Sequence, residues 1–172
     1  MTATTVATHS ETIPDWSNRP YSAADLDDVL ALFTESDFYY RTAIPDSRPQ
    51  WEIVDLLGDD TRLLFADGAL VGLYAVETVG QSHACHHQVH LRLRAAAPLS
   101  WWTAAYREVV AALRARREVV RLVVQVGEFD RRGLNAARAF GLIDEGTLAG
   151  VTVHNGQRAG YVYFAQIWEP TS

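Results

Sequence analysis

One almost uninterrupted apolar run constrains the fold of this chain more than any other feature. Residues 119–126 read VVRLVVQV, and only Arg121 and Gln125 interrupt the run. A strand with one solvent-exposed face alternates polar and apolar residues, whereas a strand that is buried on both faces can be apolar at consecutive positions. The run therefore predicts a central strand with helices on both sides of its sheet, which is an α/β architecture.

Apolar spacing and turn residues predict the remaining elements around this strand. Helical periodicity favours four helices, at 23–35, 50–57, from 98 or 100 to about 117, and 130–140. Further strands are expected at 62–66, 70–76, 142–153 and 158–168, and the alternation of residues 89–94 favours another. Asp67-Gly68 and Asn155-Gly156 suit tight hairpin turns. We expect a mixed sheet of about six to seven strands flanked by about four helices.

Composition limits the classes of protein and partner. The chain has 172 residues, a net charge of −6 and one cysteine, Cys85. The acidic balance argues against nucleic acid as a partner, and no apolar run approaches a membrane span. A lone cysteine excludes an internal disulfide and fits the cytoplasm. Residues 1–18 read as a flexible leader without the pattern of a signal peptide, and 19–172 as one domain.

Three segments resemble the GNAT superfamily of N-acetyltransferases. The family's opening strand and first helix resemble Arg19-Pro20 followed by residues 22–26. Its second and third strands resemble residues 65–72. Its fifth strand and the helix after it resemble residues 121–126 and the segment that ends in Phe140-Gly141-Leu142. The resemblance spans roughly residues 19–168. It implies a GNAT-like fold and the transfer of an acyl group, usually acetyl, from a coenzyme A thioester to an amine. The donor would bind where the fourth and fifth strands separate.

The same resemblance implies a binding site for acetyl-CoA or another acyl-CoA, but this chain departs from its pattern. The family holds the donor pyrophosphate on a glycine-bearing loop at the start of the third helix, yet residues 81–126 contain no glycine. A tyrosine that protonates the departing thiolate is replaced by Ala137. The residues expected to contact the donor are Leu91, Leu93, Arg94, Ser100, Trp101, Trp102 and Thr103.

A histidine cluster supplies the candidates for acid–base chemistry. Strand alternation places His87 on one face of the fourth strand, and His86 and His90 on the other. Several relatives carry a general base on this strand, and His87 aligns best with it; His90 and Glu77 are the reserve candidates, and His86 is assigned to the substrate. The alternative is that the imidazoles only fill a half-exposed strand. A metal site would need a helix that gathers His83 with these three, so no metal is expected.

Aromatic residues suggest where the acceptor binds. Phe38, Tyr39 and Tyr40 follow the first helix, which the resemblance places over the acceptor pocket, although packing of the loop explains them equally well. The indoles of Trp101 and Trp102 either stack on the donor adenine or fill the groove in which its arm runs.

Three functions follow from these observations. The first is an acyltransferase that acts on the amine of a small molecule, in which His87, His90 or Glu77 removes the proton. The second is a GNAT-like protein that has lost ordinary coenzyme A binding and uses a carrier-protein donor or other histidine chemistry. The third is a non-catalytic binding module. A homodimer through the C-terminal strands is possible in each case.

Overall fold

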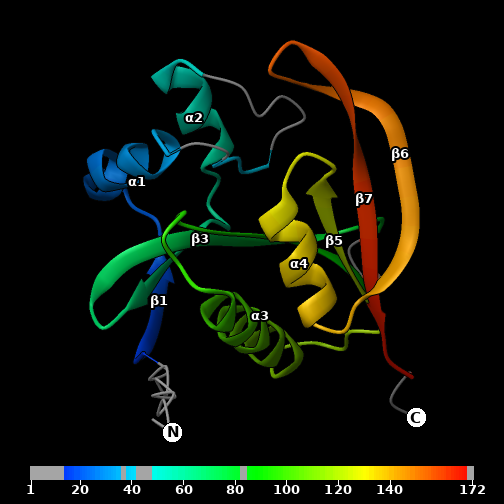
Figure 1. The fold of residues 1–172 in the computed structure, drawn as a ribbon. Helices are drawn as coiled ribbons and strands as arrows, with labels where there is room; N and C mark the ends of the chain where they lie inside the picture. Colours follow the sequence, from blue (N-terminus) through cyan, green and yellow to red (C-terminus); the bar gives the residue numbers. More distant parts are fainter. Residues whose placement is uncertain (1–13, 36–37, 42–47, 82–84, 170–172) are drawn as a thin grey trace, which may run out of the picture.

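The computed structural model describes residues 14–35, 38–41, 48–81 and 85–169 (Figure 1). Residues 1–13 of the expected leader, the loop segment 42–47 and His83 lie outside the described residues. The described chain forms one seven-stranded sheet in the order β1-β2-β3-β4-β5-β7-β6. The strands are β1 (Trp16–Pro20), β2 (Arg62–Ala66), β3 (Ala69–Thr78), β4 (His86–Leu93), β5 (Arg121–Gly127), β6 (Ile143–His154) and β7 (Gln157–Ile167).

The sheet is divided at the only parallel pairing among these strands, that of β4 with β5. Four residue pairs join the two strands, from His86 opposite Arg121 to Val89 opposite Val124. Beyond them β4 continues beside β3 and β5 continues beside β7. A gap therefore opens between β4 and β5 toward their carboxyl ends, as the GNAT resemblance predicted.

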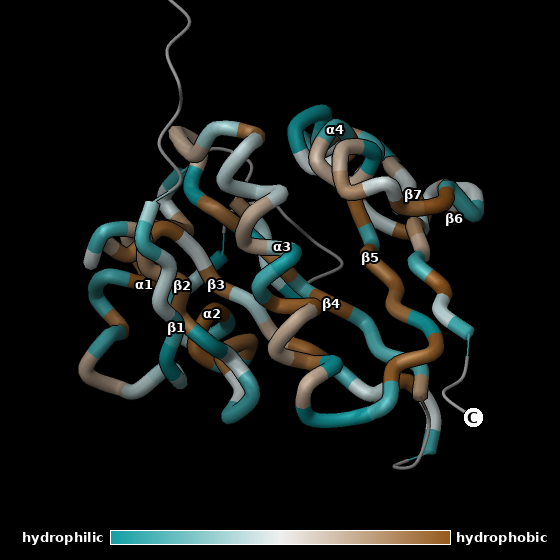
Figure 2. Tube along the Cα trace, turned by 90° about the horizontal axis from the view of Figure 1, so that it is seen from below, coloured by the Kyte–Doolittle hydropathy of each residue, from teal (hydrophilic) through white to brown (hydrophobic). Residues whose placement is uncertain are grey.

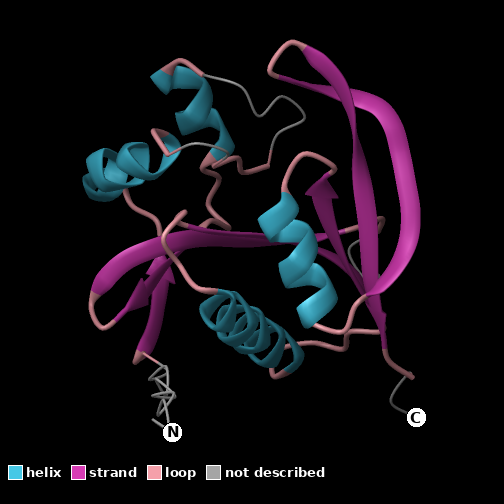
Figure 3. Cartoon of the chain, in the orientation of Figure 1, coloured by secondary structure: helices cyan, strands magenta, loops and turns pink. Residues whose placement is uncertain are grey.

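Helices cover both faces of the sheet (Figures 1 and 3). A 3₁₀ turn (Ala23–Asp25), α1 (Leu26–Phe33) and α2 (Gln50–Leu56) pack on one face, where Val29 and Ile53 join Leu73 in one apolar cluster. On the other face, α3 (Leu99–Arg114) and α4 (Arg131–Ala139) bury residues such as Val109 and Ala136 against the sheet. Figure 2 shows β4, which contains both polar and apolar residues, and the more apolar β5 beside these two helices. The prediction of a strand covered on both faces is confirmed.

The turns also follow the sequence. Asp67-Gly68 and Asn155-Gly156 all have positive φ angles, between 50° and 80°. Positive φ at both central residues is the geometry of the type I′ turn, whose twist matches that of the flanking strands. None of the helices in the described part of the chain is long and apolar enough to cross a membrane.

Two sequence expectations need correction. Residues 16–18 were assigned to the leader, but they pair with β2 in strand β1. The indole of Trp16 lies edge-on against Trp101 with ring centroids 5.9 Å apart, and this apolar contact anchors the strand. The helical alternative for the histidine cluster is wrong over residues 86–90, because these residues begin β4.

Gly72 provides a test of how tightly β3 and β4 approach. A Cβ at this position would lie 2.1 Å from the carbonyl oxygen of Arg92. We expect Gly72→Ala to lower the free energy of unfolding by about 1–3 kcal/mol, since the added atom must displace β4. Urea denaturation measures the change. Ala69→Ser adds an atom at an exposed site of the same strand and should stay within about 0.5 kcal/mol of the parent. Equal stability of the two variants would contradict this packing.

Candidate active site

A cavity of about 430 Å³ lies at the gap between β4 and β5 and is lined from both faces of the sheet. Besides other residues of β4 and β5, two sets of side chains from different parts of the chain line it. The first set, which we call the polar half, consists of Tyr39, Tyr40, Arg41, Asp55, Glu77 and His90. The second set, the apolar half, consists of Trp102, Tyr106, Gly133, Ala136, Ala137 and Phe140. One continuous cavity thus joins ionisable groups to an apolar chamber.

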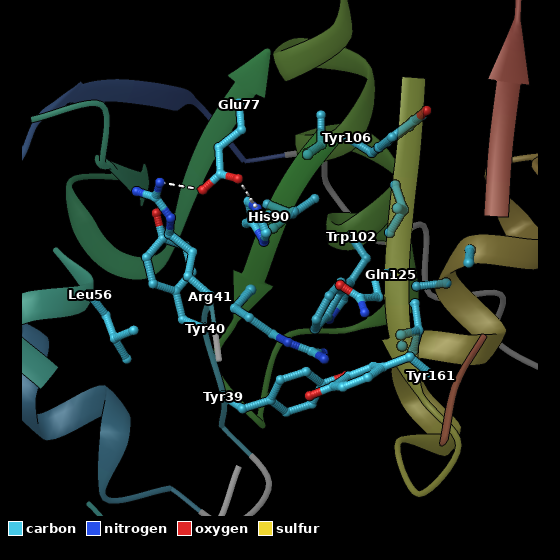
Figure 4. A pocket seen from close by; sticks show the side chains of 18 of the residues that line it. Tyr39, Tyr40, Arg41, Leu56, Glu77, His90, Trp102, Tyr106, Gln125 and Tyr161 are labelled. Atoms are coloured by element: carbon cyan, nitrogen blue, oxygen red, sulfur yellow. Dashed lines mark hydrogen bonds and ion pairs between the residues drawn. The ribbon is translucent and has the colours of Figure 1, made fainter. Parts of the chain in front are cut away.

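An ordered group of charges lies in the polar half (Figure 4). Oε2 of Glu77 on β3 lies 3.4 Å from Nε2 of His90 on β4. The other carboxylate oxygen of Glu77 accepts a hydrogen bond from Arg41, whose second nitrogen donates to Asp60 Oδ1 at 2.6 Å. Glu77 and His90 point to the same face because their strands are adjacent and antiparallel. The imidazole is therefore held beside a carboxylate whose position Arg41 fixes.

The environment keeps this imidazole neutral and the carboxylate charged. Burial lowers the pKa of His90 below its ordinary value, although the negative charge of Glu77 opposes the shift. Burial would raise the pKa of Glu77, but the interactions of its carboxylate with His90 and with the Arg41 guanidinium outweigh this effect and lower that pKa. The buried Nε2 of His90 lacks a hydrogen-bond partner of good geometry among the described residues. A neutral imidazole in this position can accept a proton from a ligand.

A buried ion pair crosses the gap at its wide end. Arg92 Nη1 on β4 lies 2.5 Å from Oδ2 of Asp130, which is the N-cap residue of α4 and accepts from the backbone N–H of Gly133 at 2.8 Å. The hydroxyl of Tyr39 donates to Asp130 at 3.1 Å and accepts from the N–H of Gly127 at 2.9 Å. The Arg92 guanidinium also lies 3.5 Å from the centre of the Tyr39 ring. These contacts fix the distance between the separated strands.

The predicted donor residues are only partly brought together. Leu91 and Trp102 line the cavity, so Trp102 fills part of the groove without closing it. Leu93 is buried in the core beside the cavity and Thr103 lines a second, shallower cavity. Ser100 is exposed, and Trp101 packs against Trp16.

The loop before α3 fits a pyrophosphate poorly. Its Ala95 N–H donates to the carboxylate of Glu35, to which Arg94 is also paired at 3.4 Å. The N–H groups of Trp101 and Trp102 both lie within hydrogen-bonding range of the Pro98 carbonyl oxygen, at 3.0 and 3.4 Å. A carboxylate of the chain itself thus occupies a position that an anionic ligand would need. This loop therefore does not fit the phosphates in the way the family implies.

The structure changes the ranking of the candidate bases. His87, the first candidate, does not line the cavity; its side chain is buried on the other face, where Nδ1 lies 3.3 Å from Thr78 Oγ1. His86 also lies outside the cavity, near Arg121. His90 and Glu77 are both in it. Among the described residues, no three His, Cys, Asp or Glu side chains are grouped so as to hold a metal ion.

Of the three aromatic residues predicted to contact the acceptor, two line the cavity and one does not. Tyr39 and Tyr40 line the cavity. Phe38 does not; its ring packs edge-on against Phe33 with centroids 5.1 Å apart, as the packing alternative predicted. Sequence reasoning missed Arg41 and Asp130, and it considered Arg92 as a phosphate contact rather than as the partner of Asp130. The alternation of β4 had placed Arg92 on the face of His90, and Asp130 had the position of a helix cap.

Comparisons with known proteins agree with this geometry at the level of fold. No family model matches the chain, and no curated protein matches it in sequence. Solved structures do match. The acetyltransferase of Salmonella typhimurium that modifies the N-terminal serine of ribosomal protein L7/L12 is 12% identical, with a TM-score of 0.72 over 90% of this chain and 95% of that one. The chain has the GNAT fold.

Two further structures show the same GNAT likeness. The ribosomal-protein-alanine N-acetyltransferase of Brucella melitensis is 15% identical, with a TM-score of 0.69 over 88% of this chain and 99% of that one. The L7/L12 acetyltransferase RimL, solved in complex with coenzyme A, is 12% identical, with a TM-score of 0.72 over 88% and 93% of the two chains. The fold expectation is confirmed. At sequence identities this low, the structural similarity supports the fold alone.

The buried ion pair makes a strong prediction for stability. Arg92→Met leaves the Asp130 carboxylate buried without its cation, so we expect a loss of about 3–5 kcal/mol in the free energy of unfolding. The double variant Arg92→Met with Asp130→Asn should recover part of that loss, because the uncompensated charge is gone while the cap of α4 is kept. Urea denaturation measures both. Arg138→Met, an exposed arginine of α4, is the control. If Arg92→Met behaves like that control, the pair does not stabilise the gap.

Proposed function

We propose that this protein is an N-acyltransferase that moves an acyl group from a thioester to the amine of a small molecule. The observation that carries the proposal is the single cavity that passes through the gap between β4 and β5. It places a neutral imidazole and a carboxylate on one side and an apolar chamber on the other. This arrangement suits an amine that loses a proton and a thioester arm that avoids water. The GNAT fold supports the same reaction class by analogy.

In the proposed reaction the amine enters the polar half beside Tyr39, Tyr40 and His90. Its nitrogen attacks the thioester carbonyl carbon, its proton passes to His90 Nε2, and Glu77 stabilises the imidazolium that forms. The C–N bond replaces the C–S bond, and the thiolate leaves with the electron pair of that bond and takes a proton from water. Beyond Val89 the edge of β4 is not paired with β5. We assign the oxyanion of the intermediate to backbone N–H groups on that edge.

A second form of the donor is favoured by the loop before α3. Glu35 holds the Ala95 N–H, and the loop carries no glycine that would let a pyrophosphate approach. A carrier-protein thioester needs only the pantetheine arm in the cavity and places no pyrophosphate on this loop. In addition, α4 carries Arg131, Arg132 and Arg138 with no acidic residue, which suits an acidic carrier.

The assignment of the base is tested by His90→Ala. We expect kcat to fall roughly 100-fold or more, since a positioned general base contributes at least this much. Release of free thiol from acetyl-CoA and octanoyl-CoA, with a panel of primary amines, measures the rate. His87→Gln is the control, because His87 lies outside the cavity. If His87→Gln loses the activity and His90→Ala keeps it, the base is wrongly assigned.

The pH dependence tests the pairing with Glu77. Only neutral His90 accepts a proton, so kcat/KM should fall as the pH drops through the pKa of His90, which lies below its ordinary value of about 6.5. The Glu77 charge raises that pKa. We therefore expect Glu77→Gln to move the acid limb of the profile to lower pH, whereas the exposed Glu108→Gln should leave it in place. A shift toward higher pH would contradict the assigned interaction.

Glu35→Gln separates the two forms of donor. Because Glu35 repels an anion at the loop before α3, its neutralisation should tighten coenzyme A binding severalfold if the phosphates lie on this loop. Binding of an acylated pantetheine, which lacks the pyrophosphate, should not change. Calorimetric titration of both ligands measures the difference. Equal affinities for coenzyme A before and after the substitution would show that the phosphates do not bind at this loop.

A further inference from the structure

A second cavity lies between α3, the residue that follows α4 and the end of β7. Its volume is about 550 Å³, and Arg107, Val110 and Arg114 of α3 line it together with Phe140 and Trp168. We call this cavity the α3–β7 groove. Small-molecule sites are typically cavities of roughly 300–1,000 Å³ with a mainly apolar lining and a few polar groups. Neither the amine nor the thioester of the proposed reaction uses this groove.

Two stacked rings separate the groove from the cavity at the gap between β4 and β5. Tyr106 and Phe140 line both cavities, and their rings stack with centroids 4.3 Å apart and planes 4° from parallel. The hydroxyl of Tyr106 donates to Gln166 on β7 at 3.1 Å, which holds the ring in place. A ligand in the groove can therefore contact this wall without entering the other cavity.

The groove carries a positive charge that the protein does not balance. Arg107 and Arg114 are exposed, and none of the described residues that line the groove is acidic. Neither guanidinium forms an ion pair with a described residue, although the chain as a whole has a net charge of −6. The two residues are two helical turns apart on one side of α3, about 10 Å along its axis. Their long side chains can converge on one anionic group, which would relieve their mutual repulsion.

An aromatic side chain joins these cations to an apolar floor. The Arg114 guanidinium lies 5.0 Å from the centre of the Trp168 ring, a distance at which cation and ring attract each other. The backbone N–H of Trp168 donates to the carbonyl oxygen of Val120 at 2.8 Å, which fixes its position. Trp168, Phe140 and Val110 pack against the core but remain partly exposed in the groove. An anion held by the guanidinium would thus carry its body onto this floor.

From these observations we infer that the α3–β7 groove binds an organic acid with a planar aromatic body. The carboxylate lies between Arg107 and Arg114, and the ring lies against Trp168 and Phe140. A small polar anion would leave the apolar floor exposed to water, and a neutral hydrocarbon would leave both cations without a partner. The inference does not rest on the proposed acyl transfer, because no residue assigned to the chemistry of that reaction lines the groove.

Binding of 2-naphthoate, followed by nuclear magnetic resonance of the indole N–H groups, tests the inference. The chain has five tryptophans, and loss of one signal in Trp168→Phe identifies that of Trp168. We expect 2-naphthoate to shift this signal with a Kd of about 1 mM or tighter, the range that a ligand of its size reaches. The neutral 2-naphthamide should bind at least about tenfold more weakly, since hydrogen bonds to charged groups are stronger. Acetate, which lacks the ring, should cause no saturable shift at the same concentrations.

Substitutions of arginine locate the bound acid. Arg107→Gln and Arg114→Gln should each weaken the binding of 2-naphthoate at least about threefold, and the double variant about tenfold or more. Arg131→Gln, at an exposed arginine of α4 outside the groove, is the matched control and should leave the affinity unchanged. Arg41→Gln removes a cation of the cavity at the strand gap and should also have no effect. Thermal denaturation checks that each variant is folded.

Three results would overturn the inference. Absence of a saturable shift of the Trp168 signal would show that the groove does not take this class of ligand. Binding that depends on Arg41 but not on Arg107 or Arg114 would place the acid in the cavity at the strand gap. Equal affinity for 2-naphthoate and 2-naphthamide, or an equal loss in Arg131→Gln, would show that the two cations do not form a specific site.

Discussion

The site depends on a buried ion pair that spans the gap between β4 and β5. Arg92 on β4 and Asp130, the N-cap residue of α4 after β5, attract each other where the two strands have separated, and Tyr39 joins the pair through its hydroxyl and its ring. This connection fixes the separation of the carboxyl ends of the two strands. The pair is buried, so its strength depends on geometry more than on salt. It also caps α4 through Asp130, and thereby sets the wall of the apolar half.

In the proposed reaction, two environments in one cavity let a small domain bring an amine and a thioester together. The polar half keeps His90 neutral by burial, while Arg41 holds Glu77 charged beside it. The apolar half excludes water from the donor. His90 and Glu77 are positioned by the strands β4 and β3, which limits the motion of the reacting atoms. The reaction then needs no group beyond an imidazole, a carboxylate and the edge of a strand.

Local patterns predicted the fold well and the site only in part. The strand β5 and the two positive-φ turns are determined by residues that are adjacent in the sequence, so local sequence patterns are sufficient to predict them. The alternation of β4 also predicted that His87 and His90 face opposite sides. His87 lies opposite Leu122 in the part of β4 that is still paired with β5, so it is outside the cavity. Where that pairing ends is long-range information that the sequence pattern does not contain, and for this reason we ranked His87 first. Arg92 and Asp130 are 38 positions apart, and no local pattern pairs them.

The division of the sheet at four residue pairs has a consequence for recombination of such domains. The six polar-half residues precede Leu91, whereas all six apolar-half residues follow Pro98. One crossover in the connecting loop would therefore exchange the thioester chamber as a block and leave the amine side intact. The Arg92–Asp130 and Tyr39–Asp130 contacts and the pairing of β4 with β5 all span that junction, so a chimera has to preserve them to keep the two halves of the cavity together.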